Sequence, residues 1–267
     1  MATPQGGPPA PEPDQDGLLH GLILAGGKSR RMGELVGTAA GAEAEAKPLL
    51  SLQDGTTLLD SVLDHLGPQI TGDWCLSTGP AGPTYPRIPT QPMDGFEPAS
   101  GRALIPIPDQ NFALGSVGPL GGLLSGLEAV AAFQATSQGP NGPSVTVRVL
   151  SIPADTPFPP QDLVQGLQAA ARQVPSGAAV ARSAGRVHPL IGLWPIHLAP
   201  LLRRFLIEDG HRAAMAWVER CGAAVRDWPV PDEGPDPFLN INRAEDLALA
   251  RQWFVRLGRA AQAAKAD

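Results

Sequence analysis

A glycine-rich segment followed by two arginines lies near the start of the chain, directly after an apolar run. Leu22, Ile23 and Leu24 have the composition of a buried strand, and Gly26 and Gly27 follow closely. Paired glycines let the backbone turn sharply and bring its N–H groups close to an anion. Arginine grips phosphate oxygens through two parallel N–H bonds. The segment therefore predicts a binding loop for nucleotide phosphates. The alternative interpretation is a turn that only reverses the chain.

This loop differs from the two common phosphate-binding motifs. Gly27-Lys28-Ser29 is like the end of a Walker A motif, but Leu22 stands where that motif needs its first glycine. The G-x-G-x-x-G pattern of dinucleotide-binding folds is missing as well. Residues 24–33, Leu-Ala-Gly-Gly-Lys-Ser-Arg-Arg-Met-Gly, instead resemble the signature loop of a nucleotidyltransferase superfamily. Within that superfamily they closely resemble the molybdenum cofactor guanylyltransferases. The resemblance implies that Leu24, Ala25, Gly26 and Gly27 contact the nucleotide and that Arg31 is catalytic.

Two further residues suit phosphate and metal chemistry. Lys47 precedes a Leu-Leu pair, where the family carries a lysine, and its ammonium would add a positive charge for the phosphates. Asp155 follows a Val/Ile-rich run and lies in a segment that resembles a family motif, Pro-Ala-Asp-Thr-Pro-Phe. A carboxylate at a strand end is an oxygen ligand of the kind that Mg²⁺ prefers. The alternatives are a solvated lysine and an aspartate that caps a turn.

The resemblance also extends to a second nucleotide-binding segment. The family places an aspartate shortly before a Gly-Pro-Leu-x-Gly turn, which corresponds here to Asp109 and to Gly118, Pro119 and Leu120. Such a turn brings the backbone close to a base and begins a helix, although a plain helix-initiating turn has the same composition. Guanylyltransferases carry Leu-Ala-Gly-Gly where cytidylyl relatives carry Leu-Ala-Ala-Gly. Gly26 therefore favours guanine, since a side chain there would narrow the space beside the nucleotide.

Three polar residues are predicted to bind a pterin. Asn240 and Asn242 lie in a Phe-x-Asn-x-Asn segment that resembles the family's, and alternate residues of an extended chain share a face. Their amides could pair with the donors and acceptors of a pterin edge. His188, in Arg-Val-His-Pro, matches another family element. The alternatives are that Asn242 only caps a helix, with Asn240 as its turn partner, and that His188 is structural.

Strand and helix signals alternate along the chain. Strands are predicted at 22–24, 105–108, 145–152, 178–181, 190–194 and 223–228, and helices at 58–66, 119–133, 160–171, 200–207, 212–220 and 243–257. This alternation predicts an α/β fold with a doubly wound, mostly parallel Rossmann-like sheet, as in nucleotidyltransferases. Ligands of such sheets bind at the carboxyl ends of the strands. The glycine loop and Asp155 both follow predicted strands.

Composition limits the other possibilities. The 267 residues are 43% hydrophobic and carry a net charge of −6, which suits one soluble domain and argues against nucleic-acid binding. We expect a flexible tail at 1–17, a nucleotidyltransferase domain at 18–258 and a short tail at 259–267. The 34–46 and 79–102 segments are expected to be irregular. Two cysteines without metal-site spacing, no membrane span and no secretory signal predict a cytoplasmic protein.

The resemblance implies a Mg²⁺-dependent enzyme that joins GMP from GTP to the phosphate of molybdopterin, or of the molybdenum cofactor, and releases pyrophosphate. Cofactor-delivery proteins and molybdoenzyme chaperones are the implied protein partners. Two alternatives stay open at this point. One is a cytidylyl or sugar-phosphate nucleotidyltransferase that shares the loop, and the other is a non-catalytic protein that only binds a nucleotide.

Overall fold

The computed structural model describes residues 17–25, 47–78, 104–107, 118–138 and 146–263. The predictions for Gly26, Gly27, Arg31 and Asp109, for the 34–46 and 79–102 segments and for nearly all of the N-terminal tail lie outside these residues.

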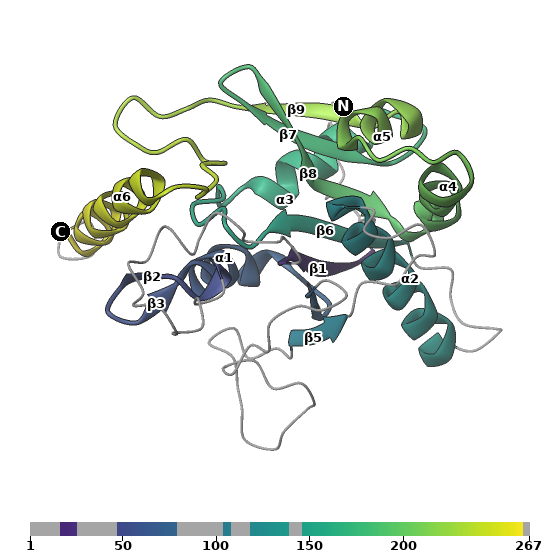
Figure 1. Cartoon of the computed structure of the whole chain (residues 1–267), viewed down its shortest axis with the longest axis horizontal. Coiled ribbons are helices and arrows are strands. Elements are labelled where there is room, and N and C mark those ends of the chain that lie inside the picture. Colours follow the sequence, from purple (N-terminus) through teal and green to yellow (C-terminus); the bar gives the residue numbers. More distant parts are fainter. Residues whose placement is uncertain (1–16, 26–46, 79–103, 108–117, 139–145, 264–267) are drawn as a thin grey trace, which may run out of the picture.

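The described chain is built around one seven-stranded sheet (Figure 1). Its strands are β1 (Leu18–Leu24), β4 (Trp74–Ser77), β5 (Leu104–Ile107), β6 (Val147–Pro153), β7 (Ala179–Ser183), β8 (Arg186–Pro195) and β9 (Ala224–Trp228). Their order is β5-β4-β1-β6-β8-β7-β9, and only β8 runs against its neighbours. Leu24 lies opposite both Ser77 and Pro153, so the carboxyl ends of β1, β4 and β6 meet at one edge.

Helices cover both faces of this sheet. Alternate strand residues point to opposite sides, and both sides carry apolar side chains that the helices bury. The helices are α1 (Leu58–Leu66), α2 (Pro119–Gln138), α3 (Leu163–Ala171), α4 (Ala199–Arg203), α5 (Ala214–Cys221) and α6 (Ala244–Ala263). Leu19 and Ile23 of β1 pack with α1 and α3, whereas Leu22 packs with α2, α4 and α5. Figure 1 shows α2, α4 and α5 together at the right of the view. The predicted doubly wound, mostly parallel sheet is confirmed.

A smaller core joins α6 to the beginning of the domain. A short hairpin of β2 (Ser51–Gln53) and β3 (Thr56–Thr57) follows a 3₁₀ turn, η1 (Lys47–Leu49). Leu50, Leu52 and Leu58 pack there with Phe158, Ile241, Leu247 and Ala250. Burying these apolar side chains holds η1 against the segment that precedes α6. This contact joins residues almost 200 positions apart, and it matters for the site described below.

Several local predictions differ from the structure in instructive ways. The strand at 190–194 is part of a ten-residue strand that pairs with β7 through a turn at Ala184 and Gly185, both with positive φ. The helix predicted at 200–207 divides into α4 and a π turn, η4 (Arg204–Glu208). Helix α6 continues beyond the predicted end at 257, into the segment expected to be a tail. Strand β4 and the β2–β3 hairpin are not predicted from the sequence.

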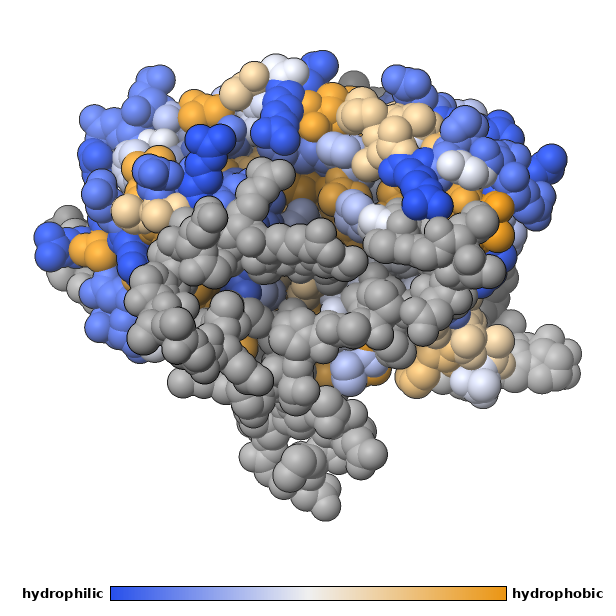
Figure 2. Space-filling view, in the orientation of Figure 1, coloured by the Kyte–Doolittle hydropathy of each residue, from blue (hydrophilic) through white to orange (hydrophobic). Residues whose placement is uncertain are grey.

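Hydrophilic and hydrophobic residues alternate over the described part of the face in Figure 2. Exposed large hydrophobic side chains are Ile105, Phe133, Met215, Val225, Val230, Leu249 and Leu257. Of the helices that the structure describes, none has the length and apolar character needed to cross a membrane.

Two helical glycines make a test of this packing. An added Cβ at Gly126 of α2 would come within 2.5 Å of the buried Leu22 side chain, whereas a Cβ at Gly258 of α6 meets nothing within 4 Å. We expect Gly126→Ala to lower the free energy of unfolding by about 1–3 kcal/mol through overpacking. Gly258→Ala should raise it by roughly 0.5–1 kcal/mol through helix propensity alone. Urea unfolding followed by circular dichroism measures both, and equal effects would contradict the packing described for α2.

Candidate active site

Three segments that are distant in sequence meet at the carboxyl edge of the sheet. Asp155 follows β6, Lys47 begins η1, and Asn240 and Asn242 lie just before α6. Strand β6 is central, between β1 and β8, and buries Leu150 and Ile152 on one face and Val149 on the other. Because β6 pairs with a strand on each side and packs on both faces, it gives Asp155 a fixed position just past the sheet edge.

Direct hydrogen bonds join the four side chains. The Lys47 ammonium donates to Oδ2 of Asp155 and, over 3.0 Å, to Oδ1 of Asn242. The Asn240 amide donates to the other Asp155 oxygen, Oδ1, over 2.6 Å. The backbone N–H of Ile241 donates to the Asp155 carbonyl over 3.0 Å. Both carboxylate oxygens of Asp155 are therefore engaged, each by a different segment of the chain.

Burial sets the electrostatics of this cluster. The side chains of Lys47 and Asp155 are only 15% and 16% exposed. Burial raises the pKa of the Asp155 carboxyl, while the Lys47 ammonium and the Asn240 amide counteract that rise. Lys47 is thus the counter-charge that allows a buried carboxylate at this position. The same carboxylate is suited to attract a second cation.

The small core around α6 explains why Lys47 and Asn242 meet. Pro48 is buried immediately after Lys47, and Leu50 packs in the same cluster as Ile241. Arg251 of α6 also donates from Nε to the Ser51 carbonyl over 2.9 Å. These contacts fix the start of η1 and residues 240–242 relative to one another. The ammonium and amide groups therefore need little additional ordering to pair.

Asn242 does more than begin a helix. The alternative interpretation of the sequence makes it an N-cap with Asn240 as its turn partner. In the structure, Oδ2 of Asp246 accepts from the backbone N–H groups of Asn242 and Arg243, each over 2.8 Å. The Asn242 side chain turns instead to Lys47, and that of Asn240 to Asp155. Oδ1 of Asn240 and Nδ2 of Asn242 take no part in these bonds.

The predicted nucleotide-binding residues that the structure describes lie along the same edge or begin α2. Leu24 and Ala25 are half-buried where β1 ends, and the Leu24 carbonyl accepts from the Ala154 N–H over 3.1 Å. Gly118 has a φ of +70° and, like Pro119, is exposed at the start of α2. The Leu120 side chain is fully buried in the core. Any contact of Leu120 with a ligand must therefore come from its backbone.

His188 belongs to a neighbouring group rather than to the Lys47 cluster. Its Nε2 forms a 2.9 Å hydrogen bond with the Ser183 hydroxyl, and its half-buried ring packs on Phe238 at 5.1 Å between centroids. Burial lowers the pKa of His188, with the Asp236 carboxylate opposing that change. Sequence reasoning missed Ser183 and Asp236. The only sequence signal for Ser183 was its position shortly after a predicted strand. Many serines with a purely structural role occupy such positions.

The donor set fits Mg²⁺. This ion keeps several waters and takes one or two protein carboxylates together with substrate phosphates. Within the described residues, no group of three or more His, Cys, Asp or Glu side chains could form a protein-only metal cage. One buried carboxylate at a strand end is the kind of ligand that such a metal shares with a nucleotide.

The comparisons with known proteins agree with this arrangement. Residues 21–224 match the family model of the MobA-like NTP transferase domain. Molybdopterin-guanine dinucleotide biosynthesis protein A from Archaeoglobus fulgidus has a similar structure, with a TM-score of 0.55 and 19% identity, covering 90% of this chain and 100% of that one. A Methanothermobacter nucleotidyl transferase gives a TM-score of 0.56 at 19% identity, covering 90% and 99% of the two chains. The fold and the family model thus define a nucleotidyltransferase.

Sequence similarity identifies the family more closely. A molybdenum cofactor guanylyltransferase from Mesorhizobium japonicum is 37% identical over 234 residues, which cover 87% of this chain and 94% of that protein. The chain belongs to the MobA-like family of molybdenum cofactor guanylyltransferases. Asn240 and Asn242 lie beyond the part matched by the family model, although they bond directly to residues within it.

The buried ion pair makes a prediction for stability. Lys47→Met leaves the Asp155 carboxylate buried without its counter-charge, which typically costs about 3–5 kcal/mol. The variant should raise the pKa of folded Asp155 further, so the folded protein holds the proton more tightly than the unfolded chain does. Its stability then falls as pH rises from the unfolded-state pKa through the folded-state pKa. We expect the loss to be large at pH 8 and smaller at pH 5, measured as urea midpoints.

Arg182→Met is the matched control for this experiment. Arg182 also forms an ion pair, with Asp227, but both side chains are exposed. We expect little change in its urea midpoint at either pH. A Lys47→Met variant that behaves like Arg182→Met would contradict the role given to the buried pair.

Proposed function

We propose that this chain transfers GMP from GTP to the terminal phosphate of molybdopterin, releases pyrophosphate and forms molybdopterin guanine dinucleotide. The observation that carries the proposal is the convergence of Lys47, Asp155, Asn240 and Asn242 at the carboxyl edge of the sheet. Family membership supplies the reaction class, since the Mesorhizobium relative is named for this activity. The hydrogen bonds among these four side chains support the proposal, because they join the residues proposed for the nucleotide phosphates to those proposed for the pterin.

The reaction needs charge neutralisation more than proton transfer. An oxygen of the pterin phosphate attacks the α-phosphorus of GTP in line, and the bond from that phosphorus to the β-phosphate oxygen breaks. The attacking oxygen is already anionic, so no general base is required. Two anions must instead be brought together, which makes positioning and positive charge the main contributions to the rate.

Lys47 supplies part of that positive charge. A lysine ammonium has three N–H donors, and two of them serve Asp155 and Asn242. The third is available for a phosphate oxygen. Arg31, from the glycine loop, is the second proposed cation. The backbone of residues 24–27 and the start of α2 at Gly118 and Pro119 are proposed to hold the nucleotide, with Asp109 beside them.

We propose Mg²⁺ as the metal, with Asp155 as its protein ligand. When bound, the ion neutralises negative charge on the triphosphate and on the departing pyrophosphate. Nδ2 of Asn240 donates to Oδ1 of Asp155, so the orientation of the carboxylate does not depend on Lys47 alone. This hydrogen bond from Asn240 keeps the Asp155 carboxylate in place for the metal when the Lys47 ammonium binds a phosphate.

The pterin is proposed to lie against Asn240, Asn242 and His188. The amide groups of the two asparagines that are not used on Asp155 and Lys47 present an acceptor and donors, which match a pterin edge. The reaction belongs in the cytoplasm, where cofactor-delivery proteins would supply molybdopterin and molybdoenzyme chaperones would accept the product.

A coupled pyrophosphate assay tests the whole reaction. The purified protein with Mg²⁺ should release pyrophosphate from GTP only when molybdopterin is supplied. GTP should support this release better than ATP or CTP. The reason is the sequence resemblance, because Gly26 stands where guanylyl relatives carry glycine and cytidylyl relatives carry alanine. A preference for CTP would indicate a cytidylyltransferase. Nucleotide binding without pyrophosphate release would indicate a protein that only binds the nucleotide.

Asp155→Asn tests the metal ligand. The variant keeps the size of the side chain but removes its charge, so we expect kcat to fall by about 100-fold or more. Asp227→Asn, at an exposed carboxylate on β9, is the matched control and should keep its activity. Steady-state pyrophosphate release measures both. Near-normal turnover of Asp155→Asn would refute the proposed role.

A further inference from the structure

A second polar cluster lies beside the active site, at the carboxyl end of β7. Ser183 is 1% exposed, and its hydroxyl donates to Oδ1 of Asp236 over 2.7 Å. The same carboxylate oxygen accepts from the backbone N–H of Phe238 over 2.8 Å. Ser183 also bonds to Nε2 of His188 over 2.9 Å. One buried hydroxyl therefore connects β7, β8 and the chain that leads to α6.

Counting donors fixes the direction of these bonds. An ionised carboxylate only accepts, and a serine hydroxyl has one hydrogen to donate. Because Ser183 gives that hydrogen to Asp236, its oxygen accepts from His188. Nε2 of His188 must then carry a proton, whether the imidazole is neutral or charged. Ser183 thus determines both where Asp236 sits and which tautomer His188 adopts.

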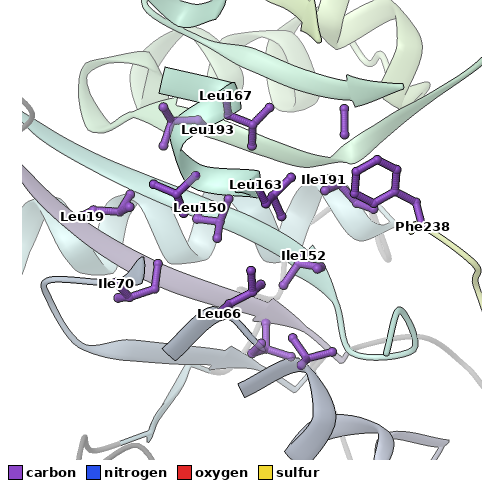
Figure 3. Packing of buried hydrophobic residues seen from close by; sticks show 14 of the residues in the cluster. Leu19, Leu66, Ile70, Leu150, Ile152, Leu163, Leu167, Ile191, Leu193 and Phe238 are labelled. Carbon is purple, nitrogen blue, oxygen red and sulfur yellow. The ribbon is translucent and has the colours of Figure 1, made fainter. Parts of the chain in front are cut away.

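Asp236 begins the segment that carries the active-site amides. Phe238, two residues later, is buried in the main core, with its ring 5.1 Å from that of His188 and 5.5 Å from that of Trp228. Figure 3 shows it beside Ile191 of β8. The Ile241 N–H then bonds to the Asp155 carbonyl. Residues 236–242 are therefore held at both ends, by Ser183 at one and by Asp155 at the other.

We propose that Ser183 is a positioning residue for the acceptor side of the site: its hydroxyl, through Asp236 and His188, fixes the 236–242 segment so that Asn240 and Asn242 face Asp155 and Lys47. The statement that this is the pterin side rests on the proposed function. The mechanical part, that Ser183 restrains residues 236–242, does not depend on it.

Ser151→Ala is a suitable control for Ser183→Ala. Ser151 is a fully buried serine of the same sheet, and its hydroxyl also makes two hydrogen bonds, to the Leu190 carbonyl and from the Trp194 indole. Neither partner lies in the 236–242 segment. The two variants remove the same atom from comparable surroundings, and only one of them releases the segment.

Native-state hydrogen exchange tests the mechanical part without any substrate. In Ser183→Ala, we expect exchange protection of the Phe238 and Ile241 amides to fall by about fivefold relative to the protection of β4, a strand that carries neither substitution, as for the loss of one hydrogen bond. In Ser151→Ala the ratio should not change. Equal ratios in the two variants would overturn the inference, whatever the protein catalyses.

Variants at Asp236 keep the test independent of whether Ser183→Ala folds. Asp236→Asn retains Oδ1 as an acceptor for Ser183 and Phe238, so protection should remain close to that of the unsubstituted protein. Asp236→Ala removes the acceptor and should lower protection of the Phe238 and Ile241 amides as Ser183→Ala does. If Asp236→Asn and Asp236→Ala behave alike, the hydrogen bonds do not restrain the segment and the inference fails.

Kinetics tests the functional part. Ser183→Ala should raise the KM for molybdopterin by about fivefold while the KM for GTP changes less than about twofold. A general loss of structure would move both constants or neither, as expected for Ser151→Ala. A selective rise in the KM for GTP would overturn the assignment to the acceptor side. An unsubstituted protein that does not transfer GMP would refute the proposed function, while the exchange result would still decide the role of Ser183.

Discussion

The buried contact between Lys47 and Asp155 is the constraint on which the site depends. A carboxylate and an ammonium taken out of water gain from each other only if their geometry is held and their other donors and acceptors are satisfied. The fold meets that condition by attaching the two charges to different rigid parts, a central strand end and a turn packed on the small core. Asn242 accepts a second hydrogen bond from the Lys47 ammonium, and Asn240 donates to the other Asp155 oxygen.

The fold could be predicted to the level of its layers but not of its exact strands. Alternating helix and strand signals indicated the doubly wound sheet, and the helix predicted at 58–66 matches α1, which Thr57 begins by forming a capping box with Asp60. The composition of β8 does not indicate that it runs antiparallel to its neighbours, because strand direction is set by the strands with which it pairs. Strand β4 has only four residues, too few for a periodic pattern. The Asp54-Gly55 turn of the β2–β3 hairpin was a readable signal, since both residues have positive φ.

The site was predicted as separate residues rather than as one cluster. Lys47 and Asp155 were singled out from a family resemblance, and Asn240 and Asn242 were assigned to a different ligand. That Lys47 bridges Asp155 and Asn242 follows from tertiary packing over separations of 108 and 195 residues, which no local pattern encodes. Ser183 and Asp236 were missed for the same reason. Their significance lies in what they join, and a lone serine or aspartate has the same appearance in any loop.

The residues around Asp155 contribute both to protein stability and to the proposed chemistry. The groups that neutralise a buried carboxylate in the folded chain are also the ones proposed to meet the phosphates and the pterin. A crystal structure with GTP and Mg²⁺ tests that claim most directly. We predict the triphosphate at the carboxyl ends of β1 and β6, with the Lys47 ammonium on a phosphate oxygen and the Asp155 carboxylate on the metal. GTP bound at any other part of the molecule, or a triphosphate that touches neither residue, would contradict it.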